Sequence, residues 1–183
     1  MAESESVQMI GIALPTLREL RGATLASLAS HGGGEADAVD TLREAGFAGG
    51  EAVLSAFEEW LRDRDSEHAP TTVGELPLDE FAARVRRFFH HAGWGEIDFT
   101  PNDDDGVAEL IVRRCWECSA TDPSDGPSCH ITTGMLASFF GQLAGYPVSV
   151  LETECCASGG EHCRFLMGNP EVMTWKWETL KGQ

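Results

Sequence analysis

The spacing of the apolar residues changes near residue 93, and this change constrains the fold more than any other feature of the sequence. In residues 1–92 apolar residues recur every three or four positions, which is typical of helices that bury one face. In residues 93–168 they occur in short alternating segments, which is typical of strands. The pattern predicts an α+β fold in which a helical N-terminal half packs on one face of a mostly antiparallel sheet.

Four helical segments are predicted in residues 1–92. The first ends near Gly32–Gly34, and a short second segment covers roughly residues 35–45. A third segment follows and ends at a polar stretch, residues 62–74, and the fourth ends near Gly93. The apolar faces consist of Leu14, Leu17, Leu25 and Leu28 in the first segment, Val53, Phe57, Trp60 and Leu61 in the third, and Phe81, Val85, Phe88 and Phe89 in the fourth.

Two hairpins are predicted in residues 93–168. The first joins a strand at residues 97–99 to a strand at residues 110–112 through a turn rich in Asn, Asp and Gly. The second joins residues 148–155 to residues 162–167 through a turn that contains two glycines. Such residues favour the backbone conformations of tight turns.

One helix is predicted between the hairpins. A loop rich in Asp, Pro, Ser and Gly, residues 119–128, precedes it, and Gly145 ends it. The residues after the second hairpin, 169–183, form a tail that is expected to pack back on the core with Trp175 and Trp177. The apolar face of the connecting helix consists of Met135, Leu136, Phe139, Phe140 and Leu143.

The length and the charge bear on domain number, partners and location. The 183 residues fit one domain, 1–183, so an effector module is expected on a separate protein. The formal charge of −17 disfavours binding to nucleic acid and to anionic membranes. No apolar run approaches the roughly 18 residues of a membrane span. Because the first residues also lack the basic region of a secretory signal, a cytoplasmic location is predicted.

The six cysteines are the residues most informative about chemistry. In a reducing compartment they are better interpreted as metal ligands or reactive thiols than as disulfides. A three-residue loop in the second hairpin would place Cys155 opposite Cys163, with Cβ atoms about 4.5–5.5 Å apart. A two-residue loop would instead pair Cys156 with Cys163.

Two further residues complete a possible set of four metal ligands. Cys129 is predicted at a helix start, where the partial positive charge lowers the pKa of a thiol. Glu152 lies three residues before Cys155, so on a regular strand the two side chains would face opposite sides. A bulge or a strand end must re-aim one of them. Cys129, Glu152, Cys155 and Cys163 suit tetrahedral zinc, and four protein ligands would make the zinc structural.

The combined pattern Cys-x22-Glu-x2-Cys-x7-Cys resembles the 4-vinyl reductase domain family. The likeness is strongest over "PSCHITTGMLASFFGQLAGYPVSVLETECCASGGEHCRF", and "LREAGFAGGEAV" resembles the helical part of the family. This family includes the sensory domains of phenol- and aromatic-responsive, sigma-54-dependent activators. The resemblance implies the fold of haem-based nitric-oxide sensors and Golgi-transport subunits, which are usually dimeric.

The resemblance also implies a small apolar pocket near a zinc ion. In the aromatic sensors four residues corresponding to Cys129, Glu152, Cys155 and Cys163 hold the zinc. A Trp-Glu pair and a His-Ala pair there contribute a Trp and a His that contact the ligand hydroxyl. Trp116 matches the first and His91 matches the second, so both are candidate ligand-binding residues.

Three functions remain open from the sequence. The first is a stand-alone, zinc-stabilised domain that binds a small hydrophobic or aromatic molecule, forms a homodimer through its N-terminal helices and acts through a partner. The second is a tetrapyrrole-binding accessory or reductase-associated protein. The absence of a nicotinamide or flavin motif favours a binding protein over an enzyme. The third is a thiol switch at Cys115 and Cys118, although on a strand one of them would be buried and the other partly exposed.

Overall fold

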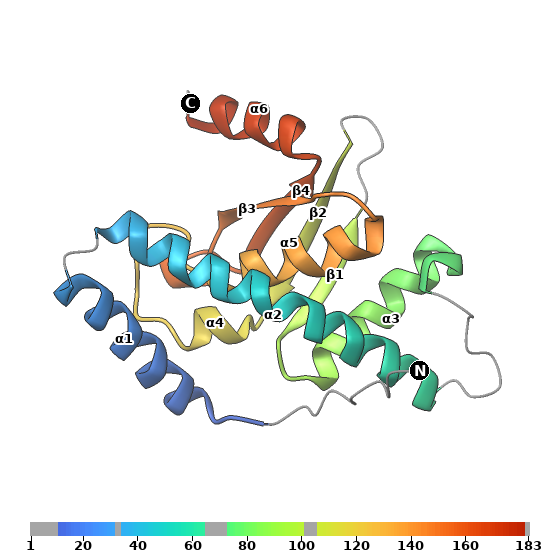
Figure 1. The fold of residues 1–183 in the computed structure, drawn as a ribbon, viewed down its shortest axis with the longest axis horizontal. Helices are drawn as coiled ribbons and strands as arrows, with labels where there is room; N and C mark the ends of the chain where they lie inside the picture. Colours follow the sequence, from blue (N-terminus) through green and yellow to red (C-terminus); the bar gives the residue numbers. More distant parts are fainter. Residues whose placement is uncertain (1–10, 32–33, 65–72, 101–105, 182–183) are drawn as a thin grey trace.

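The structure is a computed structural model that describes residues 11–31, 34–64, 73–100 and 106–181. Within these residues it contains six α-helices and one four-stranded antiparallel sheet, which confirms the predicted α+β class (Figure 1). The helices are α1 (Leu14–Ser30), α2 (Glu35–Arg64), α3 (Leu78–His91), α4 (Trp116–Ser119), α5 (His130–Ala144) and α6 (Pro170–Lys181). The strands are β1 (Glu96–Thr100), β2 (Val107–Arg113), β3 (Ser149–Glu154) and β4 (Cys163–Gly168), with short 3-10 turns η1 (Val73–Glu75) and η2 (Cys156–Ser158).

The two predicted hairpins form one sheet with the strand order β1-β2-β4-β3. Strands β2 and β4 pair at its centre, where Leu110 lies opposite Phe165 and both side chains are buried. The turn predicted for the first hairpin, residues 102–106, lies outside the described residues except for Gly106. Helix α5 packs on the sheet, and α2 packs on α5, so α5 is covered on both sides (Figure 1).

Helix α2 corrects the expectation of separate second and third segments. It continues without a break through Gly46, Gly49 and Gly50. The reason is its close packing on α5. A Cβ atom on Gly46 would overlap the backbone of Ile131, and one on Gly50 would overlap Ser138. The glycines therefore permit the contact between the two helices rather than end α2.

The core is centred on aromatic side chains from three helices. Phe57 of α2, Phe89 of α3 and Phe139 of α5 are fully buried. The ring centroid of Phe139 lies 5.7 Å from that of Phe57 and 5.7 Å from that of Phe89. Edge-on and tilted rings at this separation stabilise the core beyond the burial of their apolar area. The predicted apolar faces of α2, α3 and α5 thus meet in one core.

The first and last helices cover the core only partly. Helix α1 has no buried residue, although the Arg21 guanidinium donates a hydrogen bond to the carbonyl of Ser128 (3.0 Å). In α6 the buried side chain is Met173, whereas Trp175 and Trp177 are exposed. The expectation that these two tryptophans pack on the core is therefore wrong, because Met173 occupies the helix face that meets the sheet. No helix among the described residues has both the length and the hydrophobicity to cross a membrane.

Candidate metal centre

The first turn of α5 is held by two buried carboxylates. The backbone N–H of Cys129, the residue just before α5, donates a hydrogen bond to Glu152 (2.8 Å). The N–H groups of Ile131 and Thr132 donate to Glu117, at 3.1 and 2.8 Å. N–H groups at a helix start have no partner within the helix, so acidic side chains there satisfy them and match the helix dipole. The two carboxylates fix the position of Cys129.

An irregularity in β3 brings Glu152 and Cys155 to the same place. Glu152 pairs with Phe165, but two residues later Glu154 pairs with Arg164, so the register shifts by one between them. This shift is the bulge that the sequence requires if both side chains are to face one site. The predicted three-residue loop is wrong, because residues 155–162 form a longer connection that includes η2. The carbonyl of Cys155 accepts a hydrogen bond from the N–H of Gly160 (3.0 Å) and so shapes this connection.

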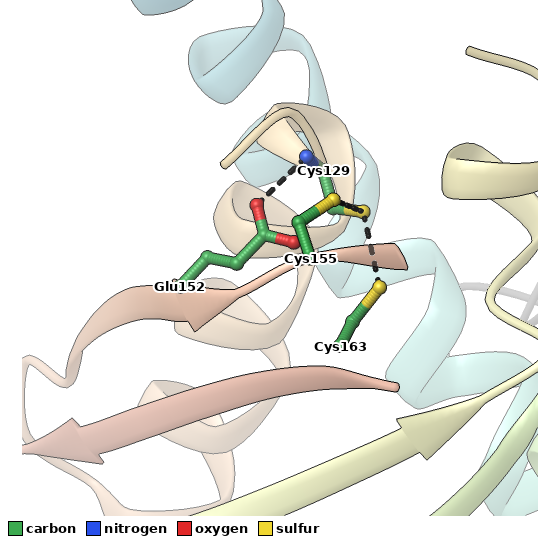
Figure 2. A group of neighbouring side chains, drawn as sticks. All are labelled: Cys129, Glu152, Cys155 and Cys163. Atoms are coloured by element: carbon green, nitrogen blue, oxygen red, sulfur yellow. Dashed lines mark hydrogen bonds between the residues drawn. The ribbon is translucent and has the colours of Figure 1, made fainter. Parts of the chain in front are cut away.

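The structure brings the four predicted metal-ligand residues together (Figure 2). One ligand atom from each of Cys129, Glu152, Cys155 and Cys163 lies within 4.8 Å of the others, and all four residues are buried. The Sγ atom of Cys129 is 3.8 Å from that of Cys155 and 3.7 Å from that of Cys163. Two sulfur ligands of a tetrahedral zinc with Zn–S bonds of about 2.3 Å lie about 3.8 Å apart.

The carboxyl group of Glu152 also fits a cation. One of its oxygens accepts the hydrogen bond from Cys129, and the other, Oε1, is buried without a hydrogen-bond partner. Burial raises the pKa of Glu152 to about 8, so without a positive charge nearby this group is largely protonated at neutral pH. A divalent cation bound by Oε1 would satisfy this oxygen and favour the carboxylate. The four residues present therefore fit a tetrahedral zinc.

The structure places Cys115 and Cys118 beside this group, which sequence reasoning missed. Both are buried, so the expectation of one partly exposed thiol is wrong. Strand β2 ends at Arg113, Arg114 adopts a left-handed conformation (φ 54°), and the chain then enters α4, whose helical spacing turns both thiols inward. The Sγ atom of Cys115 lies 3.7 Å from that of Cys129. The Cys-x2-Cys spacing was the available signal, but the strand end beside it was not recognisable.

An apolar cavity of about 360 Å³ lies at the other end of α5. It is bounded by the start of α3, the sheet and the last turn of α5, and its lining side chains carry no charge. Helix α5 rises about 1.5 Å per residue, so Leu143 at the cavity is roughly 20 Å along the chain from Cys129. The side chains that line the cavity include Phe81, Phe99, Phe140, Leu143, Tyr146 and Met167.

The two candidate ligand-binding residues do not line this cavity. His91 is exposed at the C-terminal end of α3. Trp116 is half-buried at the start of α4, and its indole nitrogen is buried without a hydrogen-bond partner. Their role in ligand binding stays a prediction, and the cavity residues were assigned from the sequence only to the core.

Replacing Glu117 with alanine is expected to lower the free energy of unfolding by about 3 kcal/mol. Two buried N–H groups of α5 would lose their acceptor, and each unsatisfied donor costs about 1–3 kcal/mol. Urea unfolding followed by circular dichroism measures the change. Glu51→Ala on the exposed surface of α2 is the control, with an expected change within about 0.5 kcal/mol. Equal stability of the two variants would contradict the capping role of Glu117.

Residues 108–169 match the model of the 4-vinyl reductase domain. Over 124 residues the chain is 32% identical to the bacteriochlorophyll synthase 23 kDa chain of Cereibacter sphaeroides, which covers 68% of this chain and 57% of that protein. An uncharacterised protein of Methanocaldococcus jannaschii is 29% identical over 66 residues, 36% of this chain and 38% of that protein. The chain thus aligns with less than two thirds of the length of these relatives.

Three solved structures share the fold. The phenol-responsive sensory domain of the transcription activator PoxR, with phenol, has a TM-score of 0.64, 19% identity and coverage of 89% of this chain and 77% of that one. A vinyl-4-reductase family protein of M. jannaschii has a TM-score of 0.53, 13% identity and coverage of 91% and 97%. Subunit 3 of a trafficking protein particle complex from Naegleria fowleri, covalently bound to palmitic acid, has a TM-score of 0.59, 11% identity and coverage of 85% and 93%.

Proposed function

We propose that this chain, whose residues 108–169 are a 4-vinyl reductase domain, is a sensor that binds a small hydrophobic molecule and is stabilised by one zinc ion. The observation that carries the proposal is the apolar cavity between α3, α5 and the sheet. Its volume of about 360 Å³ falls within the range of about 300–1,000 Å³ that is typical of ligand pockets. The zinc would be held at the opposite end of α5 by Cys129, Glu152, Cys155 and Cys163.

The chemistry of the cavity lining defines the class of ligand. Phe99 and Phe140 are stacked, with ring centroids 6.0 Å apart, and Phe81 meets Phe140 edge-on. The hydroxyl of Tyr146 is the polar side-chain group among the lining residues. Such a surface favours an uncharged molecule that is mostly apolar or aromatic and carries at most one polar end. The likeness to the phenol-responsive domain of PoxR supports the same class.

The zinc would act on structure rather than on a reaction. Zinc bound at this place would tie β3 and β4 to the first turn of α5, and four protein ligands leave no position for a reactive water. Three thiolates, one carboxylate and Zn²⁺ leave a net charge of about −2. The neighbouring donors that stabilise this charge are the start of α5, the N–H of Cys156, 3.5 Å from the Sγ atom of Cys163, and the Ser128 hydroxyl, 3.4 Å from that of Cys155.

Helix α1 is the element best placed to pass a change at the metal centre to a partner. The guanidinium of Arg21 contacts both the carbonyl of Ser128 and, at 3.7 Å, the carboxylate of Glu117. Both groups adjoin the first turn of α5. Leu14 and Leu20 of α1 are exposed and are the apolar side chains available to a second copy of the chain or to an effector protein. A homodimer through the N-terminal helices is part of this proposal.

A tetrapyrrole-binding role is the second candidate, and the identity to the bacteriochlorophyll synthase 23 kDa chain supports it. Tetrapyrroles of this kind carry carboxylates, whereas the lining of the cavity offers no cationic side chain. The small uncharged ligand is therefore favoured. Purified protein incubated with a porphyrin should show no shift of the porphyrin absorption band under this proposal, and a saturable shift would favour the second candidate.

Replacing Ala108 with phenylalanine is expected to weaken the binding of phenol and of uncharged aliphatic alcohols at least tenfold. Ala108 of β2 lines the cavity, and a larger side chain there takes up the space of the ligand. Isothermal titration calorimetry with a panel of these compounds measures the affinity. Ala83→Phe on the exposed surface of α3 is the matched control and should leave the affinity unchanged. The proposal fails if no member of the panel binds, or if both variants bind as the native chain does.

A further inference from the structure

We propose a second cation position next to the first, formed by the thiols of Cys118, Cys156 and Cys163, with the sulfur of Cys163 shared between the two. One sulfur from each of these cysteines lies within 4.8 Å of the other two. They come from three separate elements, α4, η2 and β4. This inference rests on the proposed zinc centre, because Cys163 belongs to both sets.

The backbone brings the three thiols together by local contacts. Helix α4 packs against η2, and the N–H of Ser124 donates a hydrogen bond to the carbonyl of Ala157 (2.9 Å), which fixes the loop after α4 to η2. Cys156 begins η2 directly after Cys155, so neighbouring residues reach different positions of the cluster. The N–H of Cys156 also points to the Sγ atom of Cys163, 3.5 Å away.

The distances around Cys163 fit a sulfur that bridges two cations. Its Sγ atom is 3.7 Å from that of Cys129 on one side and 3.6 Å from that of Cys156 on the other. Both values are close to the sulfur–sulfur separation of about 3.8 Å across a tetrahedral cation with 2.3 Å bonds. A thiolate has enough lone pairs to bind two cations, so Cys163 can serve as the common corner of two coordination polyhedra.

The donor atoms and the charge indicate the class of cation. All three donors are thiols, which select thiophilic cations such as Zn²⁺ and Cd²⁺ over Mg²⁺ or Ca²⁺. A divalent cation brings two positive charges and requires two additional thiolates, Cys118 and Cys156, so the net charge of the buried cluster does not change. A monovalent cation would increase the negative charge and is disfavoured. Cys156 is half-buried, whereas the cysteines of the first centre are fully buried, which gives the second cation access from solvent.

Cadmium provides the test, because it replaces zinc at thiolate sites and has a magnetic isotope. Reduced, metal-free protein loaded with ¹¹³Cd²⁺ is expected to bind two ions per chain in native mass spectrometry. Its cadmium spectrum should show two thiolate resonances that are split by coupling through the shared sulfur. Cys118→Ser and Cys156→Ser should each bind one ion and lose the splitting. Cys115→Ser, which changes a buried cysteine outside both sets, should keep two ions.

The possible results separate this inference from the zinc centre itself. One ion per chain in the native sequence would overturn the second position and leave the first intact. Two ions without mutual coupling would overturn the shared sulfur. Two ions in Cys118→Ser or Cys156→Ser would overturn the assigned ligands. No bound ion in the native sequence would overturn both the zinc centre and this inference.

Discussion

Replacing Cys155 with serine is expected to release the zinc and to lower the melting temperature by roughly 10 °C or more. Cys155 is buried, and its sulfur lies 3.8 Å from that of Cys129, so a hydroxyl there removes a thiolate that no nearby solvent can replace. Loss of a structural metal is among the few single changes that lower the free energy of unfolding by more than about 4 kcal/mol. In a chain of this length each kcal/mol corresponds to about 2–4 °C. Metal analysis and calorimetry measure both effects.

Cys156→Ser is the matched control, because it makes the same chemical change one residue later. Cys156 is half-buried at the start of η2 and does not belong to the first set of ligands. It should keep about one zinc per chain and melt within about 3 °C of the native sequence. If the two variants retained equal zinc and melted at the same temperature, the assignment of Cys155 as a ligand would be wrong.

Replacing Gly134 with alanine is expected to lower the free energy of unfolding by about 3 kcal/mol. Gly134 faces α2, and a Cβ atom there would overlap the carbonyl of Arg43 and approach the backbone nitrogen of Phe47 to 2.8 Å. Backbone atoms of a packed helix cannot move aside as a flexible side chain can, so the two helices must separate. Overpacking of this kind costs about 1–3 kcal/mol or more. Urea unfolding measures the loss.

Gly141→Ala in the same helix provides the control for this prediction. The nearest atom to a Cβ there is the carbonyl oxygen of Tyr146, at 3.4 Å, which is an ordinary contact. Alanine favours the helix over glycine by about 1 kcal/mol, so this variant should be as stable as the native chain or more so. A Gly134→Ala protein with the stability of Gly141→Ala would show that α2 and α5 do not pack as described.

The hydrophobic period predicted the elements of the fold because burial of one face decides both helices and strands. The alternation in residues 93–168 predicted the central pair of strands, where Leu110 lies opposite Phe165. The continuity of α2 was not predictable in the same way. A glycine weakens an isolated helix by about 1 kcal/mol, and only the contact of Gly46 and Gly50 with α5 reverses this effect.

The candidate site was predictable where spacing limits geometry. The three-residue separation of Glu152 and Cys155 required a bulge, and the register of β3 and β4 contains one. The positions of Cys115 and Cys118 were not predictable, because Arg114 turns the chain with a left-handed backbone that glycine or asparagine usually marks. The exposure of Trp175 was also hidden, since an isolated helix does not show which face meets the sheet.

The most direct test of the central claim is X-ray absorption at the zinc edge of the Cys156→Ser protein, purified in reduced form. This variant leaves the proposed first centre with its four ligands and removes a ligand of the second. The spectrum should show about three sulfur atoms at about 2.3 Å and one oxygen atom at about 2.0–2.2 Å from the zinc. A protein that holds no zinc, or a zinc surrounded only by oxygen and nitrogen, would contradict the claim that Cys129, Glu152, Cys155 and Cys163 join the hairpin to α5 through one metal ion.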